Sequence, residues 1–168
     1  MGVLALFAWG VLASAFPDAA PTWLSIDRHA PDLWAALAVW LGTRANGHGA
    51  VAWAALLGGL KDACSLDPLG THAFTLAVVT FAFVRKRGVP PRGASLAMAV
   101  FSGTLLAHAV YVLRSVPLHR GGPVLSSLVA GFPTALWTAL FAWPLLTLVD
   151  RSGLMNDLVG RRRGGLPA

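Results

Sequence analysis

The chain has 168 residues, of which 56% are hydrophobic and 12% charged, and its mean hydropathy is +0.66. This balance lies outside that of soluble domains, so we expect an integral membrane protein with a single multi-pass domain over residues 1–168. The net charge of +6 does not indicate nucleic-acid binding, because lysine and arginine lie between apolar runs rather than over a soluble face.

Six apolar runs predict an all-α fold with about six transmembrane helices. They lie near residues 2–16, 33–43, 49–60, 69–84, 94–113 and 124–149. The first run resembles the core of a secretory signal, but no basic residue precedes it and further spans follow, so we expect a retained helix. The second and third runs are too short to span alone. Pro133 and Pro144 predict a kink in the last helix.

The basic residues predict the topology of these spans. Nine of the thirteen lie in the even-numbered connections and in the C-terminal tail: Arg44, Arg85, Lys86, Arg87, Arg92, Arg151, Arg161, Arg162 and Arg163. By the positive-inside rule, both termini and the loop from Arg85 to Arg92 are cytoplasmic, and the odd-numbered connections face outward. The tail either lies along anionic lipid of the inner leaflet or is a polar end that only enforces topology.

The stretch 58–74, around the connection between the third and fourth predicted helices, contains a lysine, two aspartates and a histidine. Asp67 and Pro68 have the form of a helix start, so the fourth helix is expected to begin at Pro68. Gly58 and Gly59 each follow an alanine by four residues, a spacing that lets a neighbouring helix approach closely. We therefore expect the third helix to be central in the bundle.

Asp62 lies at the outer end of the third helix, where its short side chain cannot reach far toward water and needs a partner. One interpretation is a local cap or salt bridge, formed with the free N–H groups of the fourth helix, with Arg28 or with Lys61. The other is contact with a second protein. The local interpretation is favoured, since intramembrane carboxylates are usually satisfied within their own chain.

His72 and His108 are predicted at a depth similar to that of Asp62, so with Lys61 they could form a polar cluster on the outer side. Histidine and carboxylate groups can hold metals or relay protons. However, no ligand pair lies at i, i+3 or i+4, and the single cysteine, Cys64, excludes a thiolate-rich site. Hydrogen-bonded histidines are therefore favoured over a metal site.

The sequence has none of the common catalytic motifs. It lacks a nucleophile elbow, a zinc-protease signature and a phosphate-binding glycine-rich loop, and it contains no glutamate. We expect no enzymatic activity and no cofactor. A membrane enzyme of unrecognised type is the least favoured alternative.

Three short motifs resemble those of the MreD family of rod shape-determining proteins. Pro31-Asp32-Leu33 opens the second predicted helix, Gly58 and Asp62 end the third in a Gly-x-x-x-Asp pattern, and Leu69-Gly70 lies in the turn that follows. Chain length, the basic loop after the fourth helix and the proline-bearing last helix also fit. Lys61, beside Asp62, departs from many relatives and could neutralise that aspartate.

The resemblance implies a multi-pass protein of the bacterial inner membrane that is a non-enzymatic scaffold subunit of the cell-elongation complex, the elongasome. It would bind the single-span protein MreC and act with MreB, RodA and a class B penicillin-binding protein in peptidoglycan synthesis and cell shape. The family is also similar in fold to the substrate-binding subunits of energy-coupling-factor transporters. A small-molecule-binding transporter subunit is therefore the alternative function.

Overall fold

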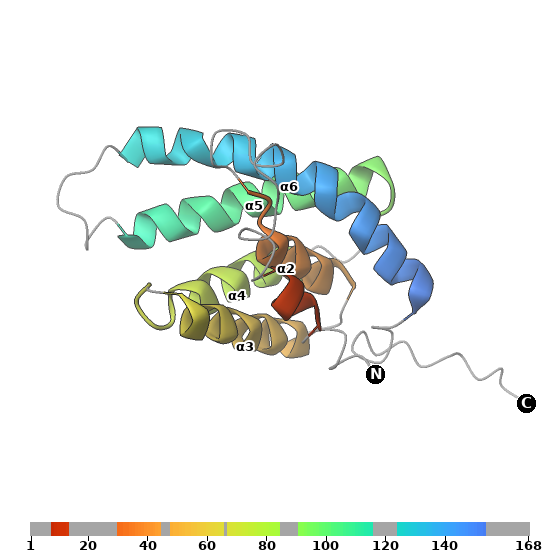
Figure 1. Cartoon of the computed structure of the whole chain (residues 1–168), viewed down its shortest axis with the longest axis horizontal. Helices are drawn as coiled ribbons and strands as arrows, with labels where there is room; N and C mark the ends of the chain where they lie inside the picture. Colours follow the sequence, from red (N-terminus) through yellow and green to blue (C-terminus); the bar gives the residue numbers. More distant parts are fainter. Residues whose placement is uncertain are drawn as a thin grey trace, which may run out of the picture.

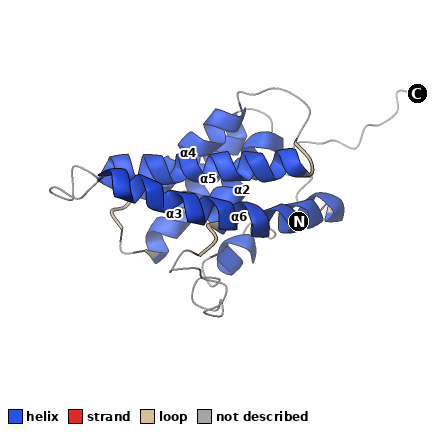
Figure 2. Cartoon of the chain, turned by 90° about the horizontal axis from the view of Figure 1, so that it is seen from above, coloured by secondary structure: helices blue, strands red, loops and turns tan. Residues whose placement is uncertain are grey.

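The computed structural model describes residues 8–13, 30–44, 48–65, 67–84, 91–115 and 124–153. Residues 8–13 form a short helical segment. The helices that follow are α2 (Leu33–Arg44), α3 (His48–Cys64), α4 (Thr71–Val84), α5 (Ala94–Ser115) and α6 (Val124–Ser152). Each falls on a predicted apolar run, and no strand occurs among the described residues (Figure 2). The all-α prediction is confirmed.

Helix α2 forms the centre of the bundle. Ten of its twelve residues are buried, and it contacts α3, α4, α5 and α6. Helices α3 and α4 pair on one side of it, and α5 and α6 pair on the other (Figure 1). The expectation that the third helix is central is wrong, because among α2 to α6 the helix α3 packs only against α4 and α2.

Within the described residues, two helices are long and apolar enough to cross a membrane. These are α5, over Ala94–Arg114, and α6, which continues through Pro133 and Pro144 and curves along its length (Figure 1). Helix α4 is apolar but shorter. The remaining predicted spans stay predictions. Large apolar side chains of α6 are exposed, as expected for a lipid-facing surface: Leu125, Val129, Phe132, Leu136, Leu140, Trp143 and Leu148.

A partly buried ion pair joins the C-terminal ends of α2 and α6. Arg44 Nη2 contacts Asp150 Oδ2 and also donates to the carbonyl of Pro91, 3.0 Å away. Trp40 Nε1 donates to the second Asp150 oxygen over 2.9 Å. The Arg44 side chain is only 6% exposed. An arginine that the sequence marks only as a topology signal therefore holds two helices and the segment before α5 together.

Replacing Arg44 by methionine is expected to destabilise the bundle, because removing one partner of a buried pair costs up to about 3–5 kcal/mol. The double variant with Asp150→Leu should be more stable than Arg44→Met alone, since no unpaired carboxylate remains. Thermal unfolding of the purified proteins in detergent measures the stability of the single and the double variant. Arg92→Met, at an exposed arginine near the start of α5, is the matched control. A double variant less stable than Arg44→Met would show that the pair does not act as a unit.

Candidate functional site

Gly58 is the point of closest approach between α3 and α4. A Cβ atom at this position would lie 2.4 Å from the Cα of Ala73 and 2.5 Å from both the Ala73 nitrogen and the His72 carbonyl oxygen. These are backbone atoms that cannot move aside as a flexible side chain could, so only glycine fits. Gly59 differs, because a Cβ atom added there would have no atom of the described residues within 4 Å. Within the described residues, a neighbouring backbone approaches Gly58 and not Gly59.

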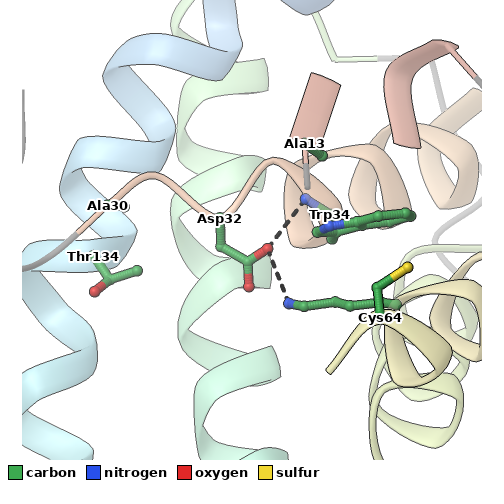
Figure 3. A pocket seen from close by; sticks show the side chains of 7 residues that line it. Ala13, Ala30, Asp32, Trp34, Cys64 and Thr134 are labelled. Atoms are coloured by element: carbon green, nitrogen blue, oxygen red, sulfur yellow. Dashed lines mark hydrogen bonds and ion pairs between the residues drawn. The ribbon is translucent and has the colours of Figure 1, made fainter. Parts of the chain in front are cut away.

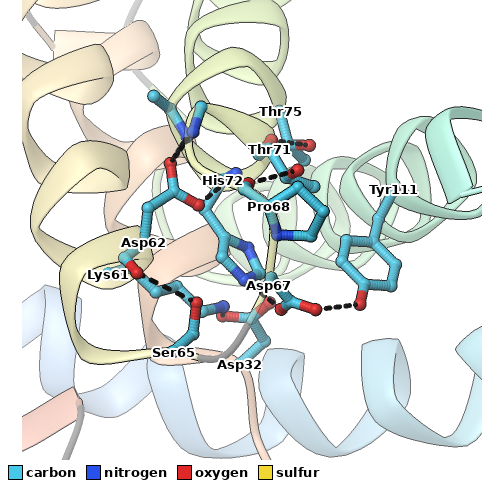
Figure 4. Close-up of polar contacts among 12 residues, drawn as sticks. Asp32, Lys61, Asp62, Ser65, Asp67, Pro68, Thr71, His72, Thr75 and Tyr111 are labelled. Atoms are coloured by element: carbon cyan, nitrogen blue, oxygen red, sulfur yellow. Dashed lines mark hydrogen bonds and ion pairs between the residues drawn. The ribbon is translucent and has the colours of Figure 1, made fainter.

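Asp62 lies one helical turn beyond Gly58 and caps the start of α4 (Figure 4). Its Oδ2 accepts hydrogen bonds from the N–H groups of Gly70 and Ala73, at 2.9 and 3.1 Å, and its Oδ1 accepts one from His72 at 2.9 Å. The residue is only 3% exposed. The first turn of a helix carries free N–H groups and a partial positive charge, so it is a suitable partner for a buried carboxylate.

Helix α4 begins at Thr71, not at Pro68 as the sequence predicts. Gly70 precedes the helix with a φ of 89°, a left-handed conformation that interrupts the helical path and favours glycine. Because Gly70 has no side chain, the capping oxygens come from Asp62 instead. Leu69, the other residue of the turn motif, is exposed.

Asp32 caps α2 in the ordinary local manner. Its Oδ1 accepts the N–H groups of Trp34 and Ala35 at 3.1 and 3.0 Å, and its own N–H donates to Thr138 Oγ1 of α6 over 2.8 Å. Burial acts to raise the pKa of the Asp32 carboxyl, but the nearby Lys61 ammonium and the two N–H donors outweigh it and lower the pKa. Helix α2 thus begins directly after Pro31 and Asp32, as the sequence predicts.

Lys61 pairs with Asp32 and not with Asp62. Its Nζ lies 3.7 Å from Asp32 Oδ1. The sequence left open whether Lys61 neutralises Asp62. In the described residues Asp62 is satisfied by N–H groups, and the lysine connects the end of α3 to the start of α2.

A second set of polar side chains connects the turn before α4 to α5. His72 Nε2 lies 2.9 Å from Asp67 Oδ2, and the hydroxyl of Tyr111 donates to Asp67 Oδ1 over 3.0 Å (Figure 4). The rings of His72 and Tyr111 stack with centroids 5.6 Å apart. Asp67 therefore ties α4 to α5 rather than capping α4.

The predicted outer-side cluster is divided between two cavities and a helix cap. His72 and His108 line one cavity of about 210 Å³, and the Nε2 of His108 also lies 2.7 Å from the Ser127 carbonyl oxygen. Lys61 lines a different cavity (Figure 3). Asp62 is not among the described residues that line either cavity. No group of three or more potential metal ligands occurs in these parts of the chain.

Sequence reasoning missed Tyr111 and Thr138, and it assigned Asp67 a different role. Tyr111 is the single tyrosine of the chain and lies in an apolar helix. A buried tyrosine hydroxyl usually needs a polar partner, so this residue type carried a signal. Thr138 carried none, since threonine is common in such helices.

Six of the basic residues predicted to set topology lie outside the described residues: Arg85, Lys86, Arg87, Arg161, Arg162 and Arg163. Arg92 is described and exposed. Its N–H donates to Ser95 Oγ over 2.9 Å just before α5.

The comparisons with known proteins give one match. No curated protein and no solved structure shows significant similarity to the chain, so the predicted likeness to energy-coupling-factor subunits stays a prediction. The family of the rod shape-determining protein MreD matches over residues 2–152. This range contains all three motifs and both long apolar helices, which agree with a membrane protein. The chain belongs to the MreD family of rod shape-determining proteins.

Proposed function

We propose that this protein is a non-enzymatic adaptor that binds the transmembrane helix of an MreC-like partner. Through that partner it would act with MreB, RodA and a class B penicillin-binding protein to organise lateral peptidoglycan synthesis. Family membership supports a role in rod shape. The observation that carries the adaptor role is the outer face of α3, where small residues lie beside two exposed leucines and a Cβ atom added at Gly59 would have no described atom within 4 Å.

The exposed Leu56 and Leu60 lie on the outer face of α3 together with four small residues, Ala52, Ala55, Gly59 and Ala63. Of these small residues, Ala52 and Ala63 are exposed, and the other two are half-buried. Lipid is as apolar as a helix interface, so association in a membrane depends on close packing, and small residues allow backbones to approach. The exposed face of α6 carries more large side chains, including Leu136 and Trp143. This contrast favours α3 as the partner surface and α6 as a lipid surface.

The proposed topology has both termini in the cytoplasm. Arg44, Pro91 and Asp150 meet at one end of the bundle, while Asp32 and Lys61 meet at another. This grouping supports an alternation of inward and outward helix ends. The basic tail would lie near anionic lipid on the cytoplasmic side.

Replacing Gly59 by leucine is expected to weaken partner binding without unfolding the chain. A bulky side chain at a close helix contact costs about 1–3 kcal/mol, and each 1.4 kcal/mol is about tenfold in affinity. The measurement is the amount of a co-expressed MreC-like protein recovered per purified copy of this protein. We expect a loss of about tenfold, by the same conversion.

Gly49→Leu is the matched control. Gly49 is also in α3, and a Cβ atom added there would likewise have no described atom within 4 Å, but it lies ten residues away, about 15 Å along the helix. It should leave partner recovery unchanged. Full recovery with Gly59→Leu, or equal losses with both variants, would count against a partner on this face.

A further inference from the structure

A cavity of about 360 Å³ opens beside the N-terminal end of α2 (Figure 3). Its described lining includes Asp32, Trp34, Lys61, Cys64 and Thr134, and we call it the Lys61 cavity. Its volume lies at the lower end of the roughly 300–1,000 Å³ typical of small-ligand sites. Asp32 and Thr134 also line the smaller cavity that contains His72 and Tyr111, so polar groups surround Asp32 on two sides.

The two charged groups of the Lys61 cavity form an ion pair, but both can still make further hydrogen bonds. Lys61 Nζ and Asp32 Oδ1 are 3.7 Å apart, which is longer than a hydrogen bond. Asp32 Oδ1 already accepts two backbone N–H groups, whereas Asp32 Oδ2 accepts no hydrogen bond from the described residues. The side chains of Lys61 and Asp32 are 24% and 28% exposed, so both charges are partly desolvated and remain accessible.

This pair selects against ligands of a single charge. An anion that approaches the Lys61 ammonium is repelled by the Asp32 carboxylate beside it, and a cation that approaches Asp32 is repelled by Lys61. A ligand that carries both charges a few ångströms apart meets an opposite charge at each end. The indole of Trp34, which also lines the cavity, adds an aromatic surface that attracts ammonium groups.

We propose that the Lys61 cavity binds a zwitterionic group in which an ammonium lies close to a phosphate or carboxylate. The ammonium pairs with Asp32 Oδ2, and the anionic group accepts hydrogen bonds from Lys61. Such a group occurs in the headgroup of phosphatidylethanolamine and in free molecules such as phosphoethanolamine. This assignment does not depend on the adaptor function.

Cys64 provides the test, because it is the single cysteine of the chain, is exposed, and lines the Lys61 cavity. The measurement is the rate at which N-ethylmaleimide modifies Cys64 in the full-length protein, purified in a non-ionic maltoside detergent. Phosphoethanolamine is expected to slow the reaction about threefold at twice its dissociation constant, when two thirds of the sites are occupied. Inorganic phosphate alone and ethanolamine alone should leave the rate unchanged.

A second measurement, in lipid, distinguishes a lipid headgroup from a soluble molecule as the ligand. The same rate is measured in nanodiscs of phosphatidylglycerol, with and without phosphatidylethanolamine. Protection by phosphatidylethanolamine alone assigns the site to the lipid headgroup, whereas protection by phosphoethanolamine in detergent assigns it to a soluble molecule. No protection in either arm, or equal protection by phosphate or ethanolamine alone, would overturn the proposal.

The Lys61→Gln variant removes the cation and should abolish the protection seen with the wild-type chain. Its thermal unfolding midpoint is measured alongside, so that loss of binding is separated from loss of fold. Undiminished protection in a folded Lys61→Gln protein would also contradict the proposal. The wild-type arms decide the question if this variant does not fold.

Discussion

Replacing Gly58 by leucine is expected to abolish recovery of folded protein. Even the first side-chain carbon would lie 2.4 Å from the Cα of Ala73, so α3 and α4 would have to separate. Overpacking a core typically costs about 1–3 kcal/mol, and here the obstructing atoms are backbone, which makes the cost larger. Total stabilities are only about 5–15 kcal/mol. The measurements are the monodisperse fraction in detergent and the thermal unfolding midpoint.

Gly58→Ala should lower the unfolding midpoint in the same direction but by less. Gly59→Leu is the matched control, because this neighbouring glycine of the same helix has open space around it in the described structure. The control protein should unfold close to the wild-type temperature. A wild-type midpoint for Gly58→Ala would show that α3 and α4 do not approach this closely.

Replacing Asp62 by alanine is expected to cost a few kcal/mol of stability. The change leaves the N–H groups of Gly70, His72 and Ala73 without their acceptor, and a buried unsatisfied group costs about 1–3 kcal/mol. Asp62→Asn should fall between wild type and alanine, since it keeps one acceptor oxygen but turns an NH₂ group toward N–H donors. Thermal unfolding in detergent measures the series.

Ser65→Ala is the control for Asp62. Ser65 Oγ donates to the Asp62 carbonyl oxygen over 3.3 Å and is half-buried, so its removal should have a small effect. Asp62 variants are also expected to bind the MreC-like partner in proportion to the folded protein that remains. An Asp62→Ala protein of normal stability that loses the partner would show that the carboxylate meets the partner instead of α4.

Local patterns predicted the parts of the fold that depend on neighbouring residues. The apolar runs predicted the helices, and Asp32 caps N–H groups only two and three residues ahead. Asp62 caps groups eight to eleven residues away, across a turn whose shape depends on the left-handed Gly70. The spacing alone could not choose among its possible partners. Only the folded turn brings the carboxylate and the helix start together.

The sequence also could not predict which of the two glycines, Gly58 or Gly59, packs against α4. Successive residues of a helix point about 100° apart, so adjacent glycines face different neighbours, and the rotation of α3 is set by tertiary packing. The same holds for contacts between distant segments. Arg44 and Asp150 are 106 residues apart, and Tyr111 and Asp67 are 44 apart. No sequence spacing predicts which of these side chains meet.

The three family motifs acquire a physical explanation from this geometry. In the Gly-x-x-x-Asp pattern, Gly58 admits the first turn of α4, and Asp62, one turn later on the same face, caps that turn. Gly70 of the turn motif gives the chain its left-handed step before α4. Asp32 performs the equivalent capping at α2. The motif residues therefore build the fold, and the partner surface is proposed on the neighbouring face of α3, around Gly59.

Disulfide cross-linking tests this proposal most directly. In a Cys64→Ser protein, a Gly59→Cys change is paired with single cysteines placed along the transmembrane helix of the MreC-like partner, and membranes are oxidised before analysis. We expect cross-links from position 59, on one face of the partner helix, and none from Leu136→Cys on the exposed face of α6. Cross-links from position 136 and none from position 59 would contradict the proposed partner surface.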